Sequence, residues 1–149
     1  MRPLLQVRRL TKTFGSLTVL DGVDFDVDQG QVVCLLGPSG SGKSTLLRCI
    51  NHLERPDAGV VAVDGQIIGF RQSGKALHAL RDRDLARQCS QIGMVFQRFN
   101  LFPHRTILEN VLEGMLVVKH EARDVSRKRG LELLDRVGLA DKVASYPNH

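Results

Sequence analysis

The stretch "LLGPSGSGKSTLLRC", from Leu35 to Cys49, combines the end of an apolar segment, a glycine-rich turn and the start of a helix. Residues Gly37 to Ser44 satisfy the pattern G-x-x-x-x-G-K-[ST] of a phosphate-binding loop. Glycines let the backbone N–H groups of such a loop turn towards phosphate oxygens, and the helix N-terminus adds positive potential. The stretch therefore predicts a site for a nucleoside triphosphate.

Two polar residues at the end of this loop have individual predicted roles. The lysine, Lys43, reaches the β and γ phosphates and is the candidate catalytic cation. The hydroxyl of Ser44 is the candidate ligand for Mg²⁺. The residues expected to contact the nucleotide are Gly37, Pro38, Ser39, Gly40, Ser41, Gly42, Lys43, Ser44 and Thr45.

Composition narrows the class of protein around this loop. The 149 residues are 42% hydrophobic and 25% charged, which is typical of a soluble globular domain. The formal net charge is +5, but basic residues alternate with acidic ones, as in "LRDRDLAR" (Leu80 to Arg87), which favours a solvated helix face over a nucleic-acid surface. Apolar runs are too short for a membrane helix or a signal peptide. We therefore expect a cytosolic protein that does not bind nucleic acid.

The cysteines and histidines show no metal-ligand spacing. Cys34, Cys49 and Cys89 form no C-x-x-C pair, and the histidines, including His149, form no H-x-x-x-H pair. Dispersed cysteines in odd number fit a reducing compartment. Cys34 lies in an apolar segment, where we expect a small core residue.

Hydrophobic periodicity predicts a mixed sheet around the loop. The apolar run "QVVCLL" is typical of a strand covered on both faces, and Asp64-Gly65 predicts a tight hairpin turn. A polar helical segment is expected between the hairpin and the last strand. The predicted strands are 4–10, 23–27, 31–36 and 92–96, the hairpin is 60–68, and the first helix is 43–54.

From Thr106 onwards the pattern is helical. Thr106 precedes Glu109 at the spacing of a capping box, which predicts a helix start there. A second helix is predicted over 121–139. Its expected apolar stripe consists of Val125, Leu131, Leu134 and Val137.

Three stretches resemble the ATP-binding subunits of ABC transporters, specifically importers of polar amino acids. They are "GPSGSGKSTLLRCINHLERPDAG" (37–59), "IGMVFQRFNLFPHRTILENV" (92–111) and "LLDRVGLADKVASYP" (133–147). The resemblance covers essentially the whole chain. It implies an α/β fold with a RecA-like P-loop NTPase core, an antiparallel β-subdomain and the start of an α-helical subdomain, incomplete at the C-terminus. The implied boundary separates residues 1–97 from residues 98–149.

The resemblance also implies roles for residues outside the loop. Gln97 follows an apolar segment and resembles the Q-loop glutamine, which contacts Mg²⁺ and the water region and acts in catalysis. Phe14 resembles the aromatic residue that stacks on adenine, since its ring supplies a π face, although it can also be a core residue. Val19 is expected to pack beside the base.

The family further implies ATP and Mg²⁺ as ligands and several protein partners. These partners are permease subunits docked on the helical subdomain, a second ATP-binding subunit and, indirectly, a periplasmic or extracellular binding protein. The protein would then lie on the inner face of the cell membrane. Phe99, Leu101 and Phe102 are either permease contacts or core residues, and Arg105 stands where the family has an apolar residue.

Several catalytic elements of the family are not found in this sequence. The LSGGQ signature, the Walker-B aspartate, the catalytic glutamate and the switch histidine are absent. Asp64 does not replace the Walker-B aspartate, because Asp64-Gly65 reads as a hairpin turn. We therefore expect this chain alone to bind ATP without hydrolysing it. The alternatives are a non-hydrolysing nucleotide-binding remnant of a truncated gene and another P-loop enzyme, and the absence of N-K-x-D argues against a GTPase.

Overall fold

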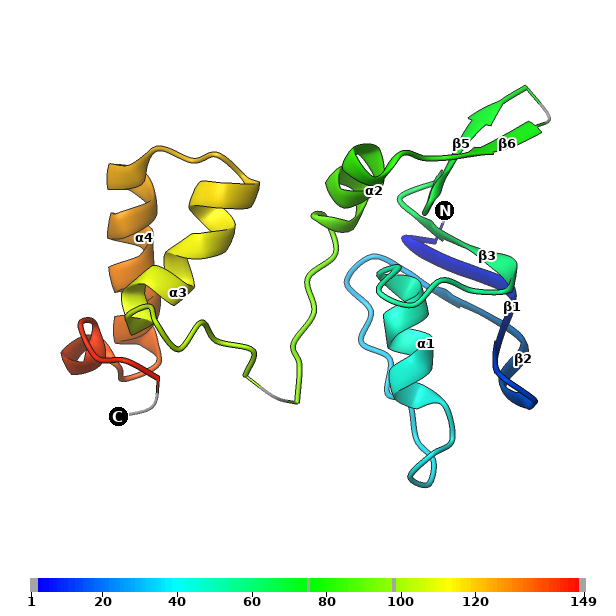
Figure 1. The fold of residues 1–149 in the computed structure, drawn as a ribbon, viewed down its shortest axis with the longest axis horizontal. Coiled ribbons are helices and arrows are strands. Elements are labelled where there is room, and N and C mark those ends of the chain that lie inside the picture. The colour runs from blue at the N-terminus through cyan, green and yellow to red at the C-terminus, as the bar shows by residue number, and fades with distance from the viewer. Residues whose placement is uncertain (1–2, 75, 98, 148–149) are drawn as a thin grey trace. The chain divides into compact units, whose positions relative to one another are not determined.

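The structure is a computed structural model that describes residues 3–74, 76–97 and 99–147. The chain divides into two compact units, residues 1–94 and residues 95–149. Figure 1 shows strands and short helices in the first unit and only helices in the second.

The described part of the first unit is built on an antiparallel sheet of four strands. These strands are β1 (Leu5–Phe14), β2 (Leu17–Val27), β3 (Ala58–Val63) and β4 (Gln66–Ile67), in the spatial order β2-β1-β3-β4. The turn between β3 and β4 contains Asp64 and Gly65, whose φ angles of 47° and 74° are both positive. Two central residues with positive φ angles are typical of a type I′ turn, whose twist matches that of the two strands it joins. The predicted hairpin and its turn are confirmed.

Helix α1 (Lys43–Ile50) covers this sheet with a short apolar face. Its buried residues Leu46 and Cys49 join the core of the first unit. That core consists of Val7, Leu10, Leu20, Leu46, Cys49, Val61 and Ile68. The helix ends before the predicted Glu54, because His52 adopts a left-handed φ of 58° and the chain turns.

The predicted strand 31–36 is wrong. No strand assignment covers these residues, and Val32 and Leu36 are 88% and 92% exposed. Cys34 is exposed too, so its expected place in the core is also wrong. A strand needs a neighbour for its backbone N–H and C=O groups. Within the described ranges, no strand pairs with this segment.

The region from residue 70 to residue 96 differs from the prediction. The polar segment expected to be helical begins as a hairpin, β5 (Phe70–Ser73) and β6 (Ala76–Ala79), and only then forms α2 (Asp82–Cys89). The predicted strand 92–96 is not formed either. As at 31–36, the described chain contains no strand that pairs with it.

The second unit consists of two helices that share a small apolar core, and the first of them has a capped start. Its elements are α3 (Ile107–Glu113), a π-helical turn (Gly114–Val118), α4 (Arg123–Arg136) and a short 3₁₀ turn (Ala140–Lys142). The capping box is confirmed: the Glu109 N–H donates to Thr106 Oγ1 (3.2 Å), and the Thr106 N–H donates to Glu109 Oε2 (2.8 Å). Leu108, Leu112 and Leu134 form the core of this unit.

The predicted apolar stripe of the second helix is largely wrong. Val125 and Val137 are 61% and 66% exposed, and only Leu134 of the predicted set is buried. The buried face of α4 contains Ser126 and Gly130 instead. A Cβ at position 130 would lie 2.7 Å from Leu112 Cδ2. Glycine thus allows α4 to approach α3 closely, and small residues rather than apolar ones mark the contact.

Candidate nucleotide-binding site

The glycine-rich loop leads directly into α1, as predicted. Gly40 and Gly42 have φ angles of 81° and 86°, which residues other than glycine rarely adopt. A Cβ at position 42 would lie 2.9 Å from the Val19 carbonyl oxygen. The loop is therefore glycine-rich for two local reasons, its left-handed turns and its close approach to β2.

The start of α1 is open to an anion. Gly42 is its N-cap residue, and among the described residues no side chain caps the first turn. The first backbone N–H groups of a helix have no partner within the helix, and the helix dipole is positive there. The first turn of α1 holds no acidic residue, whereas α2, α3 and α4 each hold at least one. Free donors, a positive dipole and no acidic side chain suit a phosphate group.

Lys43 folds back over the loop that precedes it. Its Nζ donates to the carbonyl oxygens of Gly37 (2.9 Å) and Pro38 (2.7 Å) and to Ser41 Oγ (3.1 Å). These contacts place the ammonium group at the concave side of the turn. The geometry suits a cation that exchanges loop oxygens for phosphate oxygens.

The other loop residues lie at the surface of the first unit. The exposed positions are Gly37, Pro38, Ser39, Gly40, Ser41 and Ser44, while Lys43 and Thr45 are half-buried and Gly42 is buried. The Ser44 hydroxyl is therefore accessible at the start of the helix. The nine predicted loop residues thus span the glycine turn and the first residues of α1, and six of them are exposed.

Phe14 and Val19 come to the same end of the β1–β2 hairpin. Phe14 pairs with Leu17 at the hairpin turn, and Phe14 is 47% exposed. Val19 lies two residues further along β2 and approaches the loop at Gly42. The hairpin thus presents an accessible aromatic ring beside a strand that touches the phosphate-binding loop. Phe14 is not a core residue.

Gln97 belongs to the second unit, where it is exposed. The first unit alone positions the other predicted site residues. Phe99, Leu101 and Phe102 are also exposed, by 88%, 47% and 42%. These three residues therefore lie outside the core of the helical unit.

Sequence reasoning missed Lys12, a buried cation next to the predicted aromatic residue. Its ammonium group pairs with Glu54 Oε1 (3.0 Å) and donates to the Arg55 carbonyl oxygen (2.8 Å). The hydrogen bond to Glu54 raises the pKa of Lys12, and burial opposes that shift. The signal in the sequence is the spacing of Lys12 and Phe14, since residues two apart lie on one face of a regular strand, although β1 is irregular between Lys12 and Thr13.

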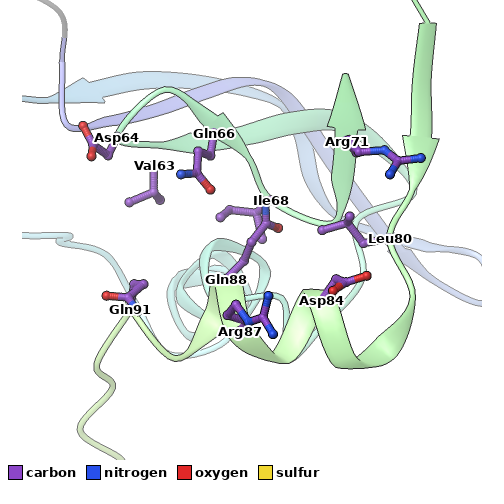
Figure 2. Close-up of a pocket in the computed structure, with 10 residues that line it drawn as sticks. All are labelled: Val63, Asp64, Gln66, Ile68, Arg71, Leu80, Asp84, Arg87, Gln88 and Gln91. Atoms are coloured by element: carbon purple, nitrogen blue, oxygen red, sulfur yellow. The ribbon is translucent and has the colours of Figure 1, made fainter. Parts of the chain in front are cut away.

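A separate cleft of about 620 Å³ lies between the β3–β4 hairpin and α2. Figure 2 shows Gln88 of α2 reaching towards the hairpin. The Gln88 side chain accepts from the Gly69 N–H (3.0 Å) and donates to the Ile67 carbonyl (3.3 Å), so it fastens α2 to the hairpin. Asp64 lines this cleft from the turn between β3 and β4.

The described helices include none that is both long enough and apolar enough to span a membrane.

Comparison with known proteins is consistent across sequence and structure. The sequence matches the ABC transporter family over residues 20–148. It is 50% identical over 144 residues to the arginine transport ATP-binding protein ArgV of Corynebacterium glutamicum, with 97% of this chain and 57% of that protein covered. It is 49% identical over 144 residues to the L-cystine transport system ATP-binding protein TcyN of Escherichia coli K12, with 96% and 56% covered.

The fold is similar to a solved ATP-binding cassette. The dimeric post-hydrolysis structure of the cassette MJ0796, bound to ADP and Pi, superposes with a TM-score of 0.80 at 33% identity. The match covers 97% of this chain and 62% of that one. The chain thus has the fold of an ATP-binding cassette and spans somewhat more than half the length of the relatives it matches.

Proposed function

This chain belongs to the ABC transporter family, and we propose that it is the ATP-binding subunit of a transporter that imports a polar amino acid. The observation that carries the proposal is the start of α1, where a glycine loop, uncapped N–H groups and Lys43 meet without an acidic neighbour. The names of the relatives add the class of cargo, since they refer to arginine and L-cystine.

ATP binding in this proposal divides between the loop and the β1–β2 hairpin. The loop N–H groups and Lys43 hold the phosphates, because charge-assisted hydrogen bonds to phosphate are strong. The exposed ring of Phe14 stacks on the adenine, and Val19 packs beside the base. Stacking uses a π face and reads no base edge.

The residues present suit Mg²⁺ as the metal. Mg²⁺ prefers oxygen ligands and binds through few protein groups together with substrate phosphates. The accessible Ser44 hydroxyl is such a ligand, and the family resemblance assigns the same role to the amide oxygen of Gln97. When bound, the metal neutralises charge on the β and γ phosphates. Lys43 acts on the same phosphates as the catalytic cation of the proposal, and the neutral Gln97 is its second catalytic residue.

The proposed partners follow from the family. Permease subunits dock on the second unit, and the exposed residues Phe99, Leu101 and Phe102 are the proposed contacts. A second ATP-binding subunit completes the ATP site, and a periplasmic or extracellular binding protein delivers the cargo to the permease. This places the protein in the cytoplasm on the inner face of the membrane.

An uptake assay tests this function. Cells whose own gene carries Lys43→Ala are compared with wild-type cells for uptake of labelled arginine and labelled cystine. We expect uptake of at least one of them to fall to background. Lys142→Ala, an exposed lysine in the second unit, is the matched control and should leave uptake unchanged. Normal uptake of both compounds in the Lys43 variant contradicts the proposed cargo.

A phosphate-release assay tests the part of the function that this chain supplies. We propose that residues 1–149 alone bind ATP but do not turn it over, because the LSGGQ signature, the Walker-B aspartate and the catalytic glutamate of the family are not found in this sequence. Lys43→Ala serves as the control for contaminating ATPases. Turnover that disappears in that variant contradicts the proposal.

A further inference from the structure

The segment that follows α1 is fastened to the end of β1 by a group of polar contacts. Asp57 Oδ2 accepts hydrogen bonds from the Thr13 N–H (2.7 Å) and the Thr13 hydroxyl (2.8 Å). The Asp57 N–H donates to the Thr11 carbonyl (2.9 Å). These bonds hold the pKa of Asp57 below its ordinary range, the Thr13 N–H having the largest effect. The end of β1 therefore cannot shift without disturbing the segment after the phosphate-binding helix.

Lys12 is the centre of this group and is itself almost fully buried. It is 8% exposed, and its ammonium group contacts Glu54, the Arg55 carbonyl and Asp57. The Asp57 contact is the longest, at 3.5 Å. A lysine is rarely buried unless it is paired. Three oxygens from one segment fix the position of this charge.

The same ammonium group lies over the Phe14 ring, 5.1 Å from its centroid. At this distance a cation is attracted by the electrons of the ring face, more strongly where water is excluded. A ring has two faces, and Lys12 lies over one of them. Phe14 is still 47% exposed, so ring surface remains for a ligand.

We propose that Lys12 is a positioning residue for ATP binding: held by the segment after α1, it fixes the Phe14 ring so that the free face can stack on the base. This inference rests on the proposed function, in which Phe14 binds adenine. It adds that adenine affinity depends on a residue that touches neither base nor phosphate. It also links the base contact to the segment that follows the phosphate-binding helix.

The test compares ATP with inorganic tripolyphosphate, which carries phosphates but no base. Calorimetric titrations of the purified protein are made for wild type and Lys12→Met. We expect Lys12→Met to weaken ATP binding by about three- to tenfold, the range of a partly desolvated cation–π contact. Binding of tripolyphosphate should be unchanged. Arg8→Met, another β1 cation whose ion-pair partner is Asp26, is the matched control and should change neither affinity.

Two further variants separate positioning from general support of the fold. In a Phe14→Leu background, Lys12→Met should cause no additional loss of ATP affinity, because the ring through which it acts is gone. Glu54→Gln keeps Lys12 but weakens its anchor, and it should lower the ratio of ATP to tripolyphosphate affinity by about twofold. This milder variant decides the question if Lys12→Met does not fold.

Two results overturn the inference. One is an unchanged ratio of ATP to tripolyphosphate affinity in Lys12→Met and Glu54→Gln, which includes equal losses for both ligands. The other is a full Lys12→Met effect without the Phe14 ring. A wild-type protein that binds tripolyphosphate, and binds ATP no more tightly, would refute adenine stacking itself. A wild-type protein that binds neither refutes the proposed function rather than the role of Lys12.

Discussion

Helices α1 and α3 begin in opposite ways. At α3, the Thr106 hydroxyl accepts from a backbone N–H of the first turn, and Glu109 accepts from the N–H of Thr106. At α1, the N-cap is Gly42, the first turn contains Lys43, and no acidic side chain is present. One helix start satisfies its donors from within, and the other leaves them to a ligand.

The difference shows that the start of α3 stabilises its helix, whereas the start of α1 is suited to bind a ligand. A capped start stabilises the helix by about 1 kcal/mol, and an acidic side chain in the first turn adds to this through the helix dipole. An uncapped start with a cation loses both contributions. A bound phosphate restores both, because it accepts the free N–H bonds and supplies the negative charge. Stability and binding thus use the same donors at different helices.

The largest expected effect breaks the open start. Lys43→Ala should weaken ATP binding by about 1.5–3 kcal/mol, or roughly 10- to 150-fold, the value of a hydrogen bond to a charged group. Calorimetric titration with ATP measures this change, and Lys142→Ala is the control. Unchanged affinity in folded Lys43→Ala protein would show that the loop does not bind the phosphates.

The next effect concerns a polar group that has no partner in the helical unit. Ser126 Oγ is buried on the face of α4 that also contains Gly130, and it has no hydrogen-bond partner among the described residues. Ser126→Ala should stabilise this unit by about 1–2 kcal/mol, since an unsatisfied buried hydroxyl is costly and alanine favours a helix. Urea unfolding followed by the fluorescence of Tyr146, the single tyrosine of the sequence, reports on this unit.

The control for Ser126→Ala is Lys128→Ala, an exposed position on the same helix. It should change the unfolding free energy by less than about 0.5 kcal/mol. A loss of stability in Ser126→Ala would show that the hydroxyl makes a hydrogen bond that stabilises the unit.

A third change opens the closed helix start. Thr106→Ala removes the hydroxyl that caps α3 and should cost about 1 kcal/mol of unfolding free energy. Thr106→Ser keeps the hydroxyl and should retain most of the stability. The same Tyr146 signal in urea measures both variants. Equal losses in the two variants would mean that the side-chain methyl group, rather than the cap, is what matters.

The smallest effect is a pH dependence of the same cap. Hydrogen bonds from the Thr106 N–H, and then from its hydroxyl, hold the pKa of Glu109 below its ordinary value. The folded-state pKa is therefore below the unfolded one. The stabilisation is complete above the unfolded pKa, about 4.3, and is lost as pH falls through the folded pKa. Urea midpoints of Glu109→Gln should depend less on pH in this acid range than those of wild type, and identical profiles would contradict the prediction.

Local rules predicted those features whose causes lie within a few residues. The glycine loop, the Asp64-Gly65 turn and the Thr106–Glu109 box all depend on backbone angles or contacts between near neighbours. The accessible loop at the start of α1 was therefore predictable from the sequence. The family was predictable too, because its motifs are long and specific.

Strand pairing and helix packing were not predictable, because they depend on which other segments of the chain lie beside a strand or a helix. The segment 31–36 has the composition of a buried strand but no strand beside it among the described residues, so composition alone misled. Gly130 is not part of the predicted apolar stripe, yet its missing side chain lets α4 approach Leu112 closely. The stripe expected from periodicity was displaced for that reason.

The sequence by itself thus determined the chemistry of the site, a lysine and a glycine turn at a helix start. The tertiary structure decided which groups support that site. Lys12 reaches Glu54 and Arg55 across many residues of sequence, and only folding brings β1 against the segment that follows α1. The reason is physical: local motifs set backbone angles and hydrogen bonds within a turn, whereas the position of a buried charge depends on elements that meet only in the folded chain.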